Sequence, residues 1–185
     1  MNVHPHLQMD KPTFLAWVQG REGRYELAGR RVVMITGGSM AHAKIVRNLL
    51  LLLHGQCDQQ KLNVIADFGV DLGPDTLRYP DVLVVPAGVP RKSLTVTDPV
   101  FIAEVISPSS ATVDLGDKAT EYLRLPSLFA YLVLDQDEPK AWLWMREPEG
   151  FSPGPAVIAG QDAVMRIGSL GVELGLSEIY AGIED

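Results

Sequence analysis

The chain has 185 residues, a size typical of one globular domain rather than several. Hydrophobic residues make up 46% of it and charged residues 21%, which excludes an intrinsically disordered protein. The single cysteine, Cys57, excludes an intrachain disulfide framework and favours a reducing compartment. No apolar run is long enough to span a bilayer, and residues 1–11 lack the pattern of a signal peptide, so we expect a cytoplasmic protein.

The charge is unevenly distributed along the chain. The net charge is −7, whereas proteins that bind nucleic acid broadly are usually basic. Residues 1–61, however, hold eight Lys or Arg against four Asp or Glu, and the remainder is strongly acidic. One interpretation is that both parts are solvated surface. The other is a basic N-terminal face beside a carboxylate cluster that needs a metal ion.

The first third of the sequence predicts two helices around a hairpin. Residues 10–20 have a capping Asp10 and an apolar stripe, which predicts a short helix. Residues 25–35 predict two short strands around a tight turn. Ser39 then caps a second helix that runs to about His54, and its broad apolar face is typical of a buried core helix.

The rest of the chain predicts mainly strands. Residues 81–85 predict a short apolar strand, and residues 100–106 predict another that is apolar on both faces except at Glu104, which is typical of the middle of a covered sheet. The other predicted elements are a half-exposed strand at 64–70, a helix at 113–125, a hairpin at 129–134 and 141–145, a loop at 147–160, a strand at 164–167 and a short helix capped by Ser177. We therefore predict one α/β domain over residues 1–185, with its core at about 12–182 and a mixed central β-sheet flanked by helices.

Glu104 interrupts an otherwise apolar strand. An ionised carboxylate is costly there unless a partner or a metal ion compensates it. Asp81 opens the preceding apolar strand, so the two acids converge if these strands are neighbours. Two close carboxylates share either a proton or a cation, and oxygen ligands favour magnesium or manganese over zinc. The alternative is that Glu104 pairs with a core Arg or Lys, or caps a backbone group.

A polar face follows this strand on the predicted helix. Asp114, Lys118 and Tyr122 are spaced by four residues, which puts them on one face. A lysine one turn into the helix can reach back to the strand end, where it could hold a phosphate or orient a water molecule. The alternative is a solvated Asp114–Lys118 ion pair.

These motifs, in this order, resemble the Uma-type restriction endonuclease family, whose members have the PD-(D/E)XK nuclease fold. The resemblance runs from about Phe14 to Tyr180. Its motifs are Tyr25-Glu26-Leu27-x-Gly29, His42 at the start of a helix, Pro80-Asp81-Val82, Glu104-Val105-x-Ser107-Pro108-Ser109 and Asp114-x-x-x-Lys118-x-x-x-Tyr122.

The resemblance implies metal-dependent hydrolysis of phosphodiester bonds in DNA. It implies that Asp81 and Glu104 ligate Mg²⁺ or Mn²⁺ with help from the carbonyl of Val105. It implies that Lys118 contacts the scissile phosphate or the attacking water. It also implies that Glu26 is an acid early in the sequence that completes the pocket.

Two departures from the family pattern matter. The superfamily usually places its lysine two residues after the acid, where this chain has Ile106, so Lys118 has to act from the helix. The family often has an acid at the position of Ala28, so Glu26 is either a site residue or a surface strand residue. The alternative to an enzyme is a non-catalytic nuclease-fold module that acts in binding or assembly, which the net charge of −7 favours.

Three further features are open to two interpretations each. His42 either lines the pocket or is structural. Trp142 and Trp144 share a strand face that predicts an oligomer contact in preference to base stacking. Because two active sites related by a two-fold axis suit cleavage of both strands, we expect a homodimer.

Overall fold

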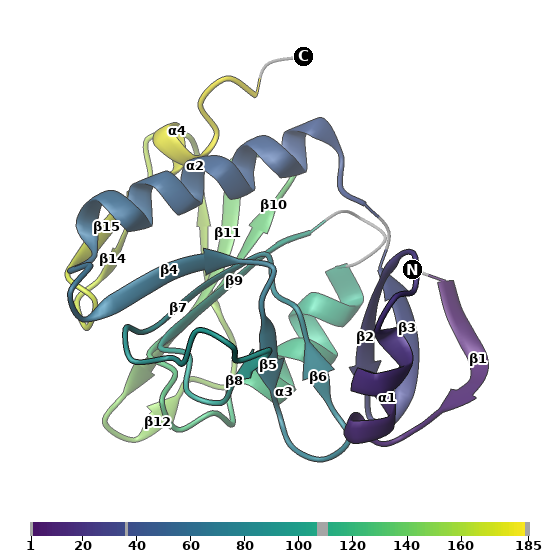
Figure 1. The fold of residues 1–185 in the computed structure, drawn as a ribbon. Coiled ribbons are helices and arrows are strands. Elements are labelled where there is room, and N and C mark those ends of the chain that lie inside the picture. The colour runs from purple at the N-terminus through teal and green to yellow at the C-terminus, as the bar shows by residue number, and fades with distance from the viewer. Residues whose placement is uncertain (1, 36, 107–110, 184–185) are drawn as a thin grey trace.

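The computed structural model describes residues 2–35, 37–106 and 111–183. Within these ranges, the strands form a central sheet, an N-terminal sheet and a small hairpin, β14 (Val164–Ile167) with β15 (Val172–Gly175) (Figure 1). No helix in this part of the chain is long and apolar enough to cross a membrane.

The central sheet has the strand order β12-β11-β10-β9-β7-β4, and β13 also pairs with β11. Its strands are β4 (Leu62–Ala66), β7 (Val82–Pro86), β9 (Phe101–Ile106), β10 (Ala130–Asp135), β11 (Lys140–Glu147), β12 (Gly150–Phe151) and β13 (Ala156–Ala159). Strands β9 and β10 run parallel, whereas β7 runs antiparallel to β9. The predicted mixed sheet is therefore confirmed, and every residue of β9 is buried, as expected for a central strand.

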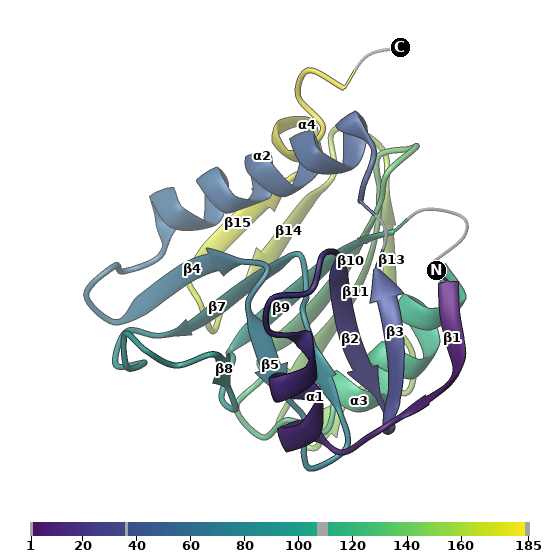
Figure 2. The ribbon, with the colours of Figure 1, turned by 45° about the vertical axis from the view of Figure 1, so that its right-hand side comes forward.

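The N-terminal sheet has the order β1-β3-β2-β6-β5-β8. Its strands are β1 (Asn2–Gln8), β2 (Arg24–Ala28), β3 (Arg31–Ile35), β5 (Gly69–Asp71), β6 (Leu77–Arg78) and β8 (Thr95–Val96). The predicted hairpin is β2–β3, and its two turn residues, Gly29 and Arg30, both have positive φ, as two-residue hairpin turns require. Figure 2 shows this sheet beside the central one, with helix α1 (Lys11–Val18) against it.

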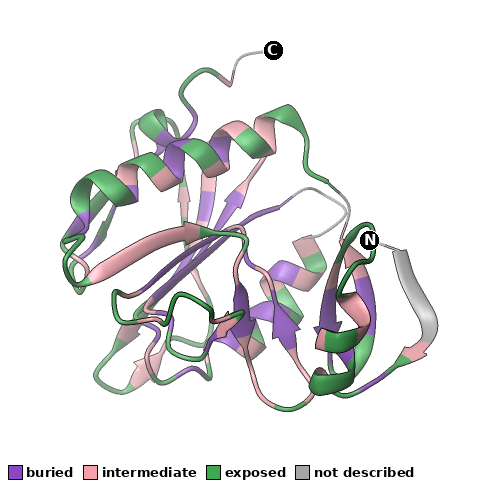
Figure 3. Ribbon diagram, in the orientation of Figure 1, coloured by how far each residue is buried: buried purple, intermediate pink, exposed green. Residues whose placement is uncertain are grey.

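Helices cover both faces of the central sheet. Helix α2 (Met40–Gln56) packs Ile45, Leu49 and Leu53 onto β7, β9 and β10, together with α4 (Leu176–Ile179). The π-helical turn η1 (Val113–Lys118) continues into α3 (Ala119–Tyr122) on the other face. Figure 3 shows the resulting pattern, in which the strands between these layers are buried and the outer side of α2 is exposed.

The start of α2 is fixed as its sequence predicts. The Ser39 side chain accepts a hydrogen bond from the backbone N–H of His42, which satisfies a donor that the first helical turn cannot pair internally. This cap fixes the backbone of the first turn, and therefore the position from which the His42 ring leaves the helix.

The single strand expected at residues 64–70 is wrong. The segment forms β4 and β5, which belong to different sheets, and Asp67 between them has φ of 52°. Aspartate tolerates this left-handed conformation better than most residues, so the chain can turn there. Gly69 then approaches β8 closely: a Cβ atom on it would lie 2.9 Å from the carbonyl oxygen of Leu94.

Two predictions near the C-terminus are also wrong. Residues 147–160, expected to be a loop, contain β12 and β13, which both pair with the long strand β11. Pairing with a strand that is already formed overrides their Pro- and Gly-rich composition. Helix α4 is preceded by Gly175, and Ser177 lies inside its first turn without capping it.

Candidate active site

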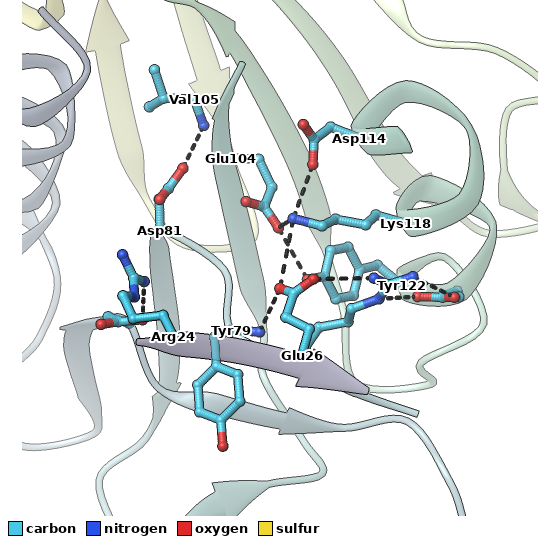
Figure 4. Close-up of polar contacts among 12 residues, drawn as sticks. Arg24, Glu26, Tyr79, Asp81, Glu104, Val105, Asp114, Lys118 and Tyr122 are labelled. Atoms are coloured by element: carbon cyan, nitrogen blue, oxygen red, sulfur yellow. Dashed lines mark hydrogen bonds and ion pairs between the residues drawn. The ribbon is translucent and has the colours of Figure 1, made fainter. Parts of the chain in front are cut away.

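Asp81 and Glu104 come from neighbouring strands, as predicted. Strands β7 and β9 pair with Val82 opposite Ala103, so the residue before β7, Asp81, continues this register opposite Glu104. Residues opposite each other across two strands point to the same face of a sheet. Asp81 is anchored there, because its Oδ2 accepts a hydrogen bond of 2.8 Å from the backbone N–H of Val105 (Figure 4).

Lys118 reaches this strand from the opposing helical layer. Its Nζ donates a hydrogen bond of 2.9 Å to Glu104 Oε1 and lies 2.9 Å from Asp114 Oδ1. The lysine is only 6% exposed, so its ammonium group is held among carboxylates rather than in water. The solvated ion pair considered for Asp114 and Lys118 is therefore wrong. The contacts agree instead with the other alternative, in which Glu104 has a core lysine as its partner.

The predicted polar face of the helix is formed, although its first turn is π-helical. The Tyr122 hydroxyl donates a 3.1 Å hydrogen bond to Glu104 Oε1, the same oxygen that Lys118 contacts. Asp114 Oδ1 is buried and makes no hydrogen bond within the described residues, so its contact with Lys118 is electrostatic alone. π-Helical turns frequently occur at functional sites.

Glu26 enters the site from the N-terminal sheet. It is 1% exposed, so the interpretation as a surface strand residue is wrong. Its Oε1 accepts a hydrogen bond from the backbone N–H of Tyr79 at 3.0 Å and lies 3.8 Å from Lys118 Nζ. Its Oε2 accepts one from Arg78 Nη1 at 3.1 Å. Glu26, Asp114 and Glu104 thus all face one lysine ammonium group (Figure 4).

Sequence reasoning missed Arg78 and Glu121. Arg78 is 2% exposed and, besides Glu26, binds both oxygens of Glu121 at 2.7 and 2.8 Å. Neither residue belongs to a motif. The available signal was the charge balance, because a chain that buries several acids needs buried cations to compensate them.

His42 lies against Asp81. Its Nε2 is 3.2 Å from Asp81 Oδ2, and this contact is the main reason why the pKa of His42 is raised. Both side chains are partly exposed, at 21% and 16%. This contact supports the interpretation that His42 lines the pocket over the interpretation that it is purely structural.

The charges of the buried groups are strongly coupled. Burial raises the pKa of Glu104 well above its ordinary value, and the nearby acids Asp114, Asp81 and Glu26 raise it further, although Lys118 opposes them. Burial alone would lower the pKa of Lys118, but the surrounding carboxylates outweigh it and raise that pKa. The surrounding carboxylates therefore favour the protonated form of Lys118.

The acids fit a divalent cation in charge and donor type. They supply only oxygen ligands, which magnesium and manganese prefer, and the buried oxygen of Asp114 lacks a hydrogen bond. In the part of the chain that the structure describes, no three His, Cys, Asp or Glu side chains are already grouped around one ion position. The carboxylates of Glu104 and Asp114 are instead turned toward the Lys118 ammonium group.

Two further expectations can be compared with the structure. Trp144 is 4% exposed and stacks on Tyr131, so it is a core residue and not part of an oligomer contact. The expectation fails for Trp144 because both faces of β11 are covered where it lies, whereas Trp142 is half-buried. The motif residues Ser107, Pro108 and Ser109 lie outside the described residues.

Comparisons with known proteins identify the family and the fold of this chain. The family model described as "Uma2: Putative restriction endonuclease" matches residues 12–176. Two similar proteins come from Synechocystis sp. and carry the names uncharacterized protein sll1609 and slr1290. The first is 31% identical over 110 residues, which cover 57% of this chain and 62% of that protein. The second is 25% identical over 185 residues, 97% of this chain and 95% of that protein.

A solved structure has the same fold. It is the crystal structure of a "putative nuclease belonging to DUF820" from Anabaena variabilis, and it superposes with a TM-score of 0.79 at 15% sequence identity. The match covers 94% of this chain and 98% of that one. The fold is thus that of the nuclease neighbour. The motif order resembles Uma-type enzymes, and the family model matches most of the chain. The protein therefore belongs to the Uma2 restriction endonuclease family.

Proposed function

We propose that this protein is a divalent-metal-dependent DNA endonuclease that hydrolyses phosphodiester bonds. The observation that carries the proposal is the contact between Lys118 and Glu104. The strand position that usually bears the lysine is Ile106, a buried core residue, and a lysine from the helix reaches the acid of the same strand instead.

Each residue has a distinct part in the proposed reaction. Asp81 and Glu104, with the carbonyl of Val105, would hold Mg²⁺ or Mn²⁺, and the ion would supply charge stabilisation of the phosphate and an activated water. Lys118, which stays protonated, would stabilise the negative charge that builds up on the phosphate. Glu26 and Asp114 would hold the Lys118 ammonium group in position.

Cleavage of plasmid DNA by the purified protein, with Mg²⁺ or Mn²⁺ and with chelator as the control, tests the proposal directly. We expect cleavage only with metal, and we expect Asp81→Ala and Lys118→Ala to abolish it. Lys118→Arg should restore little activity, because a guanidinium group has a different shape and size from an ammonium group. Cleavage by Lys118→Ala at the rate of the parent protein would refute the helix-borne lysine mechanism.

A second candidate function is a non-catalytic binding or assembly module. Its support is that Glu104, Glu26 and Asp114 already contact the cationic groups of Lys118 and Arg78, together with a net charge of −7. The thermal midpoint separates the two candidates, because a metal that binds only the folded protein must raise it. A midpoint that neither Mg²⁺ nor Mn²⁺ moves favours the module.

The assembly and location of the enzyme belong to the same proposal. A homodimer would bring two active sites to the two strands of DNA. A cytoplasmic location agrees with a single buried thiol, Cys57, and with access to DNA. Light scattering at micromolar concentration would reveal a monomer if the dimer is wrong.

A further inference from the structure

Arg78 is a buried charged residue to which the proposed reaction gives no part. It ends β6 in the N-terminal sheet, and its side chain is 3% exposed. Its Nε and Nη2 bind the two oxygens of Glu121, and its Nη1 binds Glu26. Burying a guanidinium group is costly unless its donors are paired, and here three of its nitrogens are.

The contacts of Arg78 fix the orientation of Glu26. Arg78 donates a hydrogen bond to Oε2 of Glu26, and the backbone N–H of Tyr79 donates one to Oε1. The carboxylate of Glu26 therefore cannot rotate without losing one of these hydrogen bonds. The oxygen bound by Tyr79 is also the one that lies 3.8 Å from Lys118 Nζ. The position of Lys118 relative to Glu26 therefore depends on how Arg78 holds Glu26.

Arg78 also connects two layers of the molecule. Glu26 belongs to β2 of the N-terminal sheet, and Glu121 belongs to α3, the helix that continues directly from Lys118. A bidentate pair fixes both the distance and the angle between the groups that it joins. The contacts of Arg78 with Glu121 thus hold the helix in place. Its contact with Glu26 holds the acid that faces Lys118 on that helix.

We propose that Arg78, held by Glu121, is a positioning residue that keeps the Lys118 ammonium group directed at Glu104. The inference rests on the proposed nuclease function where it concerns cleavage, but the placement of Lys118 can be measured without cleavage. Without Arg78, Glu26 would lose the guanidinium group that binds its Oε2. It would then attract Lys118 away from Glu104.

The test compares Arg78→Gln, Arg78→Lys and the milder Glu121→Gln with the parent protein. We expect kcat for plasmid cleavage to fall about 10- to 100-fold in Arg78→Gln, the range typical of partners that orient a site residue, with KM nearly unchanged because Arg78 cannot reach DNA. Arg78→Lys keeps the charge and should recover part of the loss. Glu121→Gln keeps Arg78 and should show a smaller effect of the same kind.

The second readout is the reactivity of the Lys118 amine toward an acylating reagent, followed by mass spectrometry. In the parent protein Lys118 is buried and paired, so we expect slow labelling. In Arg78→Gln, where Glu26 attracts the Lys118 ammonium group more strongly, we expect labelling of Lys118 to become several-fold slower, while labelling of Lys44 on α2 stays unchanged.

Arg146 supplies the matched control. Its guanidinium group binds the backbone carbonyls of Leu125 and Leu128, just after the same helix, and touches no acid of the site. Arg146→Gln should lower stability without changing Lys118 labelling or kcat. If Arg78→Gln and Glu121→Gln change both readouts no more than Arg146→Gln does, Arg78 is only structural and the inference is wrong. If the parent protein cuts no DNA, the nuclease proposal fails, and the labelling result alone decides the role of Arg78.

Discussion

Glu104 is surrounded by more negative charge than its single lysine can offset. Three carboxylates face Lys118, and a fourth, Asp81, lies on the adjacent strand end. In water such a cluster would be tolerated, but Glu26, Glu104 and Asp114 are almost fully buried, so the screening between them is weak. This concentration of buried negative charge thus lowers the stability of the folded protein.

The pKa of Glu104 leads to a prediction for stability. Burial and the neighbouring acids raise the pKa of Glu104 in the folded protein above the ordinary value of 4.5. The contribution of this group to the free energy of unfolding is therefore fully present below pH 4.5 and is lost as the pH rises through the folded pKa. Glu104→Gln removes this loss. In chelator, we expect the variant to melt about 2–4 °C above the parent at neutral pH, equivalent to about 1 kcal/mol, with no gain at a pH below the ordinary value. A lower midpoint at neutral pH would contradict this interpretation.

Lys118 should oppose metal binding, although the proposed reaction also gives it a part. Its ammonium group contacts the oxygens of Glu104 and Asp114 that would otherwise face a cation. Removing one partner of a buried ion pair costs about 3–5 kcal/mol, so Lys118→Met should be markedly less stable in chelator. We expect Mn²⁺ to restore more stability to this variant than to the parent, and calorimetry should give a tighter Kd. Equal or weaker Mn²⁺ binding would show that the ammonium group does not compete with the ion.

At the scale of the elements, the site depends on a helix that changes type within one turn. Asp114 and Lys118 lie in the π-helical turn η1, and Tyr122 ends α3. All three nevertheless contact the same small region around Glu104. The side chains are held by their partners in the site rather than by ideal helix geometry.

Gly116 offers a test of how firmly these partners hold the helix. A Cβ atom at this position would meet no atom within 4 Å, and the backbone does not have a positive φ. Gly116→Ala should therefore stabilise the protein by about 0.5–1 kcal/mol through helix propensity, which thermal unfolding measures. Metal response and cleavage should not change. A loss of the metal response would mean that the π-helical turn needs the freedom of glycine.

The sequence was sufficient for the elements with strong local patterns. The apolar strands β7 and β9, the capped helix α2 and the β2–β3 hairpin were predicted because their periodicity or turn residues act locally. Strands such as β13 could not be predicted, since pairing with β11 over a distance in the chain creates them. The same holds within the site: Glu104 and Lys118 were visible in motifs, whereas Arg78 is defined only by contacts with residues 43 and 52 positions away.

At the scale of the whole molecule, the basic residues do not form one uniform face. Arg24 and Arg30 pair with Asp67 and Asp75, and they lie at opposite ends of β2 and its turn. Arg24 is at the end near the site, because Asp67 donates its backbone N–H to Pro80, the neighbour of Asp81. DNA that reaches the site would therefore meet Arg24 before Arg30.

We expect Arg24 to exchange Asp67 for a phosphate group. Arg24→Gln should weaken DNA binding at low salt and reduce the slope of log K against log salt by about one phosphate contact. Arg31→Gln, an exposed arginine at the far end of the hairpin, is the matched control and should have less effect. Binding isotherms on a short duplex at several salt concentrations, in chelator, measure both. Equal slopes for the two variants would argue against an entry route past Arg24.

The buried ion pairs of Arg78 with Glu26 and Glu121 join segments that are far apart in the chain. Such contacts form only after long loops have closed, so they are among the slower events in folding. During refolding from denaturant, the helices and hairpins should recover their far-ultraviolet circular dichroism early, and protection of the Lys118 amine should return last. A partly folded chain would then carry all the residues of the site without the contacts that hold them in place, so the site would be assembled only at the end of folding.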